Sequence, residues 1–506
     1  MLIKNTGCDL TTKINNLKPT GAKTVVINNL VGNAETPPSI EGISTAVLQP
    51  SAANLLNSNS TIDWHYTAFL KSNPRSGLIS QFSSMGPSAD GYGKPTFSAP
   101  GANIVTLVPT NKGSYSIQSG TSFSAPYYSS MLALYLQSKN KTLSPVDARS
   151  IMSSSAQPVQ LDVDAQGLAF TVLQGGGAVN VSNALDLESF FIPDIINLND
   201  TENGNYSQEL EIFNTADITQ TFKLKHVPSL TGFVFNDSTI QANTYLPPYI
   251  NETAIVSMNN DILEVEAHSS SKVKIEFKPP TIDDHRLPIY SGFIIGESDK
   301  GDVISASYNG IAGNLKYTQV LDNTDDLFKQ GFPVPFTFRQ FNKEVQNDTF
   351  TFSLDKEDAP AIIYRMTGPS PYVRVDLVDS DTDFKPTYPI TQAPHKRDEL
   401  NGAFKWMDDF KNTLLGVPKK VENYMTNGIL YEERGVSRNG FMGNGEDSSY
   451  QRFNFNGTFA NGTQVPDGSY KLLLRALKVH GNYNDLDDCE YCVLVQLRNA
   501  FILTYM

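Results

Sequence analysis

The second half of the sequence, from about residue 190 onwards, consists of short segments in which apolar and polar residues alternate. A period of two is typical of strands that bury one face, and Asn, Gly, Pro and Asp fill the turns between the segments. The clearest segments are QELEIF, TFKLKHV, KVKIEF, SGFIIG, YVRVDLV and SYKLLLRAL. Since no long helical run interrupts them, the pattern predicts β-sandwiches. A break near residues 313–317 predicts two of them, over residues 191–314 and 315–506.

The first 190 residues have longer apolar runs and predict an α/β arrangement. TTKINNLKPTGAK carries apolar residues three apart and predicts a short helix, and the run KTVVINNLV after it is typical of a buried strand. Residues 45–70 predict a second strand and a helix. Residues 72–99 are rich in Ser, Gly and Pro and predict loops around short strands.

Two further helices are predicted after residue 120. The first runs from about Ser122 to Ser138 and has apolar residues on more than one face, so we expect it to be buried. The second, SPVDARSIMSSS, starts with Ser144 as its N-cap and Pro145 at the first helical position. The alternating pattern described above begins after these helices, near residue 190.

The start of the first of these helices carries a candidate nucleophile, Ser122, in the stretch QSGTSFSAPYY. The N-terminus of a helix has unpaired backbone N–H groups and a partial positive charge. The N–H group of a serine at this place can therefore stabilise the oxyanion that forms when its hydroxyl attacks a carbonyl. Gly120 allows the backbone to approach a substrate closely, and Pro126 is expected in the first turn, where its missing N–H costs little.

The motif around this serine resembles that of a known family. GTSFSAP resembles the nucleophile motif of the subtilisin-like serine proteases (subtilases, peptidase family S8), in which Gly-Thr-Ser leads into Met-Ala-x-Pro. The resemblance implies that Ser122 is the catalytic nucleophile and that Gly120 and Thr121 support its position. The sequence departs from the family at Phe123, which replaces Met, and at residues 127–130, where Tyr-Tyr-Ser-Ser replaces the usual His-Val-Ala-Gly.

Two flanking stretches carry the same resemblance. FSSMGPSADGYGKPTFSAPGANIVT, residues 82–106, resembles the segment that precedes the nucleophile in subtilases. Its matching residues are Lys94, Pro95, Ala99, Pro100 and Gly101. QGGGAVNVSNAL, residues 174–185, resembles the Gly-rich segment that closes the same domain. Three signatures in the family's order imply that residues 71–190 form the C-terminal part of a peptidase S8 catalytic domain, with an α/β fold.

The remaining parts of the chain resemble modules that accompany subtilases. Residues 1–70 resemble the C-terminal half of a protease-associated domain, which many subtilases carry as an insertion upstream of this segment. The matching residues are Gly7, Cys8, Lys13, Gly21 and Ala22. Residues 191–314 resemble the fibronectin-III-like sandwich that follows the catalytic domain in cell-envelope subtilases. Within residues 315–506, VPDGSYKLLLRALK resembles the last hairpin of an immunoglobulin-like module, and we expect the tail CVLVQLRNAFILTYM to pack poorly or to be foreign to the module.

The other members of a subtilase triad are not found in the sequence. A histidine takes the proton from the serine and an aspartate orients the histidine, and in this family both precede the serine in the chain. The one histidine before Ser122 is His65 in TIDWHYTAF, which lacks the family's His-Gly-Thr-His motif, so we do not assign it as the base. The Ala-Gly-Asn segment of the oxyanion hole is missing as well. We therefore interpret the sequence as an N-terminally truncated subtilase that is inactive as given.

Composition restricts the partners and cofactors. The net charge of −14 argues against a nucleic-acid partner, because phosphate binding needs clustered Lys and Arg. No apolar run is long enough to predict a membrane span. Cys489 and Cys492 form a lone CxxC without further ligands at zinc spacing, so we expect no metal and no cofactor, and interpret the pair as thiols or a local disulfide. The family implies an extracellular or cell-wall location, where the Asn-x-Ser/Thr sequons could carry glycans.

Three hypotheses about function follow. The first is a serine endopeptidase that acts on proteins or peptides, represented by its C-terminal part. The second is a non-catalytic remnant whose β-sandwiches bind a cell wall or another surface. The third is a secreted adhesin in which the serine motif occurs by chance, and the order of the three signatures argues against it.

Overall fold

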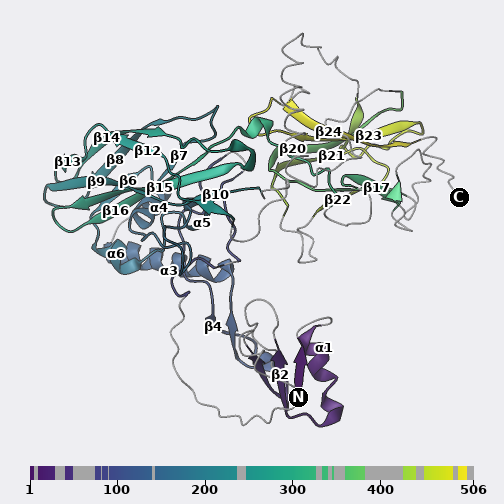
Figure 1. Cartoon of the computed structure of the whole chain (residues 1–506), viewed down its shortest axis with the longest axis horizontal. Coiled ribbons are helices and arrows are strands. Elements are labelled where there is room, and N and C mark those ends of the chain that lie inside the picture. The colour runs from purple at the N-terminus through teal and green to yellow at the C-terminus, as the bar shows by residue number, and fades with distance from the viewer. Residues whose placement is uncertain are drawn as a thin grey trace. The chain divides into compact units, whose positions relative to one another are not determined.

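The computed structural model describes most of the chain, and its contacts divide it into two compact units, Met1–Asn73 and Pro74–Met506 (Figure 1). The described residues are 1–4, 9–28, 40–48, 75–80, 82–88, 91–139, 143–235, 247–325, 333–339, 345–346, 359–381, 426–439, 450–482 and 488–497.

The described residues of the first unit form a small parallel sheet and two short helices. Its strands are β1 (Leu2–Lys4), β2 (Thr24–Asn28) and β3 (Ser44–Leu48), in the order β1-β2-β3, and its helices are α1 (Leu10–Asn15) and the 3₁₀ helix η1 (Lys18–Thr20). Ile14 of α1 packs against Val25 and Ile27 of β2 in a core of its own. The predicted helix and buried strand are confirmed. The helix predicted within residues 45–70 lies outside the described residues.

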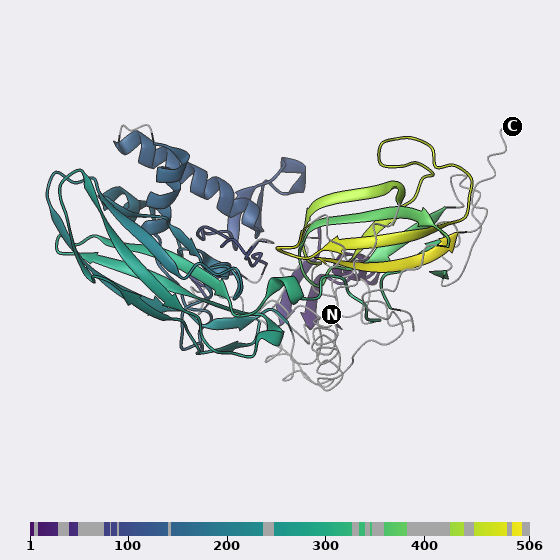
Figure 2. The same ribbon diagram turned by 90° about the horizontal axis from the view of Figure 1, so that it is seen from above.

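The second unit begins with the helical segment that holds Ser122. A hairpin of β4 (Ile104–Leu107) and β5 (Tyr115–Gln118) leads into the long helix α3 (Thr121–Lys139), which Figure 2 shows beside the strands of the next domain. The helices that follow are α4 (Pro145–Ser154), α5 (Thr171–Gln174) and α6 (Val181–Asp186). The predicted cap of α4 is confirmed, because the Ser144 hydroxyl accepts a hydrogen bond from the Asp147 N–H at 3.1 Å.

The expected burial of α3 is wrong. Only Met131 and Tyr135 are buried along this helix, where they pack with residues of α4 and α6. Tyr127, one turn before Met131, and Leu134 are 44% and 54% exposed. Apolar residues on several faces predict burial only if neighbouring segments cover those faces, and most residues of α3 remain exposed or half-buried.

The β4–β5 hairpin presents a second exposed apolar surface. Val105 pairs with Ile117 and Leu107 with Tyr115, so these four side chains lie on one face of the hairpin. All four are more than half exposed. A contiguous apolar face of this kind favours association, and a two-stranded hairpin is only marginally stable by itself.

We expect the combined substitutions Leu107→Ser and Ile117→Thr to weaken self-association of the chain. Burial of each wild-type side chain in a contact supplies about 2 kcal/mol, so the association constant should fall by roughly 100-fold or more. Analytical ultracentrifugation over a range of concentrations measures this change. Val163→Ser, which removes an exposed apolar side chain away from the hairpin, is the control and should have little effect. Equal association of both variants would exclude the hairpin as the contact.

The first β-sandwich follows helix α6. One sheet has the order β11-β10-β15-β16-β7, with β9 on β15 and β13 on β9, and the other has the order β12-β14-β8-β6. The strands are β6 (Ser189–Ile192), β7 (Ile195–Asn197), β8 (Ser207–Asn214), β9 (Gln220–Pro228), β10 (Thr231–Phe233), β11 (Tyr249–Ile250), β12 (Ile255–Met258), β13 (Ile262–Val265), β14 (Ser269–Lys278), β15 (Pro288–Ser298) and β16 (Val303–Ile311). Leu210 and Ile275 of one sheet meet Phe222 and Ile294 of the other in a shared core.

The second β-sandwich has two four-stranded sheets, β18-β17-β19-β22 and β21-β20-β23-β24. Its strands are β17 (Phe336–Arg339), β18 (Val345–Gln346), β19 (Pro360–Tyr364), β20 (Ser370–Asp379), β21 (Thr426–Val436), β22 (Gln451–Asn454), β23 (Tyr470–Leu477) and β24 (Cys489–Leu497). Among the described residues after 195, the helices are two 3₁₀ turns, η3 (Asp284–Arg286) and η4 (Leu315–Tyr317), and η4 coincides with the predicted break between sandwiches.

The first residues of the tail form part of a strand, and the expectation that the tail packs poorly stays a prediction. Residues 492–497 belong to β24, which pairs with β23 in antiparallel register. The apolar run that looked foreign therefore adds an edge strand to the sheet, because its length and β-branched content suit pairing. The rest of the tail lies outside the described residues.

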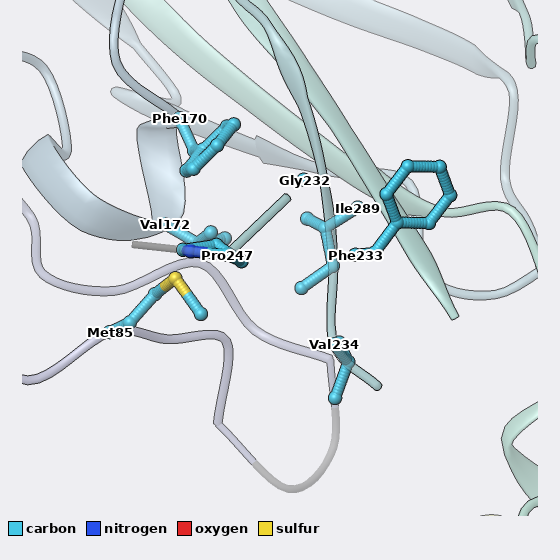
Figure 3. A pocket seen from close by; sticks show the side chains of 8 residues that line it. All are labelled: Met85, Phe170, Val172, Gly232, Phe233, Val234, Pro247 and Ile289. Atoms are coloured by element: carbon cyan, nitrogen blue, oxygen red, sulfur yellow. The ribbon is translucent and has the colours of Figure 1, made fainter. Parts of the chain in front are cut away.

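The helical segment and the first sandwich share a core. Phe170 and Val172 pack with Leu230 and Ile289 across the junction. Figure 3 shows the small apolar hollow that remains there, which leaves no room for a water molecule. Gly232 permits this contact, because a Cβ at that position would lie 2.9 Å from the Phe170 ring. The sandwich therefore helps to hold the helical segment in place.

We expect Thr171→Val to lower the free energy of unfolding by about 1–2 kcal/mol, because it removes a buried hydrogen bond across this junction. The Thr171 hydroxyl donates to the Tyr308 carbonyl oxygen at 2.9 Å. Thr215→Val is the matched control: its hydroxyl bonds the Glu188 carbonyl oxygen at the same distance in an exposed position. Urea unfolding curves compare the two variants, and equal midpoints would show that the junction bond adds nothing.

Candidate functional site

Ser122 is the second residue of helix α3 and is exposed. Its N–H group is among the first N–H groups of the helix, which have no partner within the helix. Among the described residues, no side chain forms a hydrogen bond with its hydroxyl. The structure therefore leaves both the hydroxyl and the helix N-terminus open to a further group.

The expected position of Pro126 is wrong. Because α3 begins at Thr121, Pro126 lies in its second turn and not in the first. A proline at this place has no N–H to offer to the carbonyl oxygen four residues earlier, which is that of Ser122. The first turn of α3 therefore lacks one of its helical hydrogen bonds at the candidate nucleophile.

The loop of residues 99–103 holds the start of α3 from outside the helix. The Gly120 N–H donates to the Gly101 carbonyl oxygen at 2.8 Å, and the Ser124 hydroxyl donates to the Ala99 carbonyl oxygen at 3.0 Å. The Asn103 N–H donates to the Ser119 hydroxyl at 2.9 Å. These bonds tie the second signature of the sequence to the nucleophile motif.

The Gly-rich third signature contacts the second one as well. The Gly176 N–H donates to the Thr96 carbonyl oxygen, and the Ser98 N–H donates to the Gly177 carbonyl oxygen, both at 2.8 Å. Gly175 has a φ of +64°, and a Cβ there would lie 2.3 Å from the backbone of Thr96. Only glycine suits this conformation and this distance. The three signatures, separate in the sequence, thus form one connected structure.

The supporting roles of Gly120 and Thr121 stay predictions. Thr121 is the first residue of α3 and is exposed. A Cβ on Gly120 would meet its nearest neighbours at 3.9 Å, an ordinary contact, so packing within the chain does not require glycine there. His65, Gly7 and Cys8 lie outside the described residues.

The described histidines lie in the β-sandwiches, away from the nucleophile motif in the sequence. His226 contacts the Tyr308 hydroxyl at 2.8 Å, and burial lowers the pKa of its imidazole. His268 pairs with the exposed Asp217 carboxylate. None of the hydrogen bonds of the described histidines involves Ser122.

Cys489 of the CxxC pair is a buried free thiol. Burial raises the pKa of this thiol to about 11, so it is protonated at neutral pH and a poor nucleophile or metal ligand. No helix in the described part of the chain has the length and apolar character that a membrane crossing requires.

Comparisons with known proteins agree with this geometry. Residues 8–180 match the model of the subtilase family, and residues 196–308 match that of an Fn3-like domain. C5a peptidase of Streptococcus pyogenes is 31% identical over 228 residues, which are 43% of this chain and 18% of that protein.

Two further relatives have matches of 281 residues. Minor extracellular protease Vpr of Bacillus subtilis is 26% identical, over 53% of this chain and 32% of that protein. PI-type proteinase of Lactococcus lactis is 25% identical, over 49% of this chain and 14% of that protein. The chain thus spans about a third or less of the length of these relatives. The matched models, the relatives and the connected signatures agree: the chain contains a segment similar to the subtilase family, within residues 8–180, followed by an Fn3-like domain over residues 196–308.

Proposed function

We propose that this chain carries the nucleophile part of a serine endopeptidase, with Ser122 as the nucleophile and proteins or peptides as substrates. The observation that carries this proposal is the exposed Ser122 hydroxyl at the start of α3, in a turn held by the loop of residues 99–103. The protease names of the relatives support the same reaction class.

The reaction assigns a distinct task to each group. The Ser122 oxygen attacks the carbonyl carbon of a peptide bond, and the unpaired N–H groups at the start of α3 stabilise the resulting oxyanion. The hydroxyl needs a base to accept its proton, and a histidine oriented by an aspartate performs this role in such enzymes. Acyl transfer by this route needs no metal or cofactor, and we propose none.

We further propose that the 506-residue chain is inactive when it is alone. Its described residues supply neither the histidine nor the aspartate, and the oxyanion asparagine of the family has no counterpart in the sequence.

Unit Met1–Asn73 is proposed to be part of a protease-associated domain, on the basis of its sequence resemblance. An extracellular location is supported by the name of one relative, an extracellular protease.

Supplying the missing groups tests the nucleophile assignment. A longer chain that joins the Asp- and His-bearing part of a subtilase domain to these residues should cleave casein, and Ser122→Ala in that chain should abolish cleavage. Ser129→Ala is the control, because this hydroxyl bonds the Ala125 carbonyl oxygen on the same helix and should be dispensable. Cleavage that persists in Ser122→Ala would exclude Ser122 as the nucleophile. A folded longer chain without any cleavage would favour the non-catalytic surface-binding function.

A further inference from the structure

Ser124, two residues after the candidate nucleophile, makes a hydrogen bond that the other serines of α3 do not make. Its half-buried hydroxyl donates to the Ala99 carbonyl oxygen, 25 residues earlier in the chain. The hydroxyls of Ser129 and Ser130 instead donate to carbonyl oxygens four residues earlier within the helix. Such local bonds are the usual choice of serine in a helix. The bond of Ser124 therefore links the helix to a separate segment.

The loop of residues 99–101, which accepts this hydrogen bond, lies directly against the first turn of α3. A Cβ on Gly101 would be 2.3 Å from the Ser124 Oγ and 2.8 Å from the Gly120 carbonyl oxygen. The Gly120 N–H donates to the Gly101 carbonyl oxygen on the other side of this contact. The loop is thus bonded to the residue two positions before Ser122 and to the residue two positions after it.

Hydrogen bonds from outside the helix are important for the first turn of α3. Pro126 cannot donate to the Ser122 carbonyl oxygen, so the turn that carries the nucleophile lacks one of its internal hydrogen bonds. Gly120 precedes this turn and restrains the backbone less than any other residue would. The bond from Ser124 to Ala99 compensates for this missing restraint.

We propose that Ser124 is a positioning residue for Ser122. Its bond to the loop fixes the open N–H groups at the start of α3 relative to the Ser122 side chain. The inference deepens the proposed function and rests on it for its meaning. Ser124 acts through the loop of residues 99–101 and does not itself contact a substrate in this scheme.

A cysteine at position 122 allows the test in the 506-residue chain, without proteolysis. Thiolate is the reactive form of cysteine, and aligned N–H groups at a helix N-terminus stabilise it and lower its pKa. The rate of alkylation of Ser122→Cys by iodoacetamide is followed against pH. Mass spectrometry of the peptide that contains residue 122 separates this thiol from Cys8, Cys489 and Cys492.

We expect Ser122→Cys to titrate below the ordinary thiol pKa of about 8.5. Adding Ser124→Ala should raise that pKa and slow alkylation at pH 7 by roughly 3- to 10-fold, because the N–H groups lose their fixed direction. Adding Ser129→Ala instead is the matched control and should leave the pH profile unchanged. It removes a hydroxyl from the same helix without touching the loop.

Two results would overturn the proposal. One is an unchanged pH profile in a folded Ser124→Ala variant, even with a lower Tm, since that would make the bond merely stabilising. The other result concerns Gly101→Ala, added to Ser122→Cys, which displaces the loop from α3 and replaces Ser124→Ala as the test if that variant does not fold. Gly101→Ala should raise the pKa of the introduced thiol, as Ser124→Ala should. If that pKa stays low in the Gly101→Ala variant, the loop does not position the helix N-terminus. Failure of the proposed function would appear separately, as absence of casein cleavage by the longer chain.

Discussion

The purified 506-residue chain is expected to leave casein intact and to leave Ser122 unlabelled by a fluorophosphonate. A serine hydroxyl without a base is a weak nucleophile at neutral pH. In related enzymes, loss of the serine or of the histidine of the triad lowers kcat by about 10⁶-fold, and the remaining rate depends on an intact oxyanion hole and substrate site. The oxyanion asparagine is missing from this sequence as well, so even that remaining rate should be undetectable.

Labelling followed by intact-mass spectrometry measures this directly. Ser122→Ala should behave like the unmodified chain when the chain is alone. In the longer chain that supplies the aspartate and the histidine, the same substitution should remove all labelling. Stoichiometric labelling of the 506-residue chain at Ser122 would contradict the expectation and reveal a base within it. His65→Ala would then be the first variant to examine, because His65 is the histidine that precedes Ser122 in the sequence.

Local patterns predicted the elements around the site well. The start of α3 at the nucleophile motif and the Ser144 cap of α4 follow from residues within one or two turns of each other. The exposure of Leu134 could not be predicted in this way, since burial depends on which segments cover a helix and not on the helix alone. The pairing of residues 492–497 with β23 could not be predicted locally either, because strand pairing depends on a distant partner.

The contacts within the candidate site were only partly predictable. The motif predicted Ser122 as the nucleophile, which stays a prediction, and the three signatures were expected in one domain, where the structure joins them through hydrogen bonds. The bond from Ser124 to Ala99 was missed, although the sequence carries a signal for it. Ser124 stands where the family motif has alanine, so it offers a hydroxyl that the motif does not require. A pattern match cannot give the acceptor of that hydroxyl, which lies 25 residues away.

The buried ion pair of the second sandwich provides the largest expected effect on stability. The Arg365 guanidinium donates to the Asp322 carboxylate at 3.0 Å, and the two side chains are 1% and 0% exposed. Asp322 also accepts hydrogen bonds from the N–H and the hydroxyl of Thr324, at 2.8 and 2.7 Å. A second guanidinium lies near the pair, since burial and the charge of Arg365 lower the pKa of Arg438. The Asp322 carboxylate thus offsets the charge of the buried Arg365 guanidinium.

Asp322→Ala should therefore lower the free energy of unfolding by about 3–5 kcal/mol, because it leaves the buried Arg365 charge without this carboxylate. Glu297→Ala is the matched control: it breaks an ion pair with Lys225 in which both side chains are nearly half exposed, and it should cost about 1 kcal/mol or less. Urea unfolding measures both variants. Nearly equal losses would contradict the assignment, because they would mean that the Arg365 guanidinium is hydrated or satisfied by other groups. A large difference would show that the buried Arg365 guanidinium depends on the Asp322 carboxylate, because a buried charge is costly when its partner is removed.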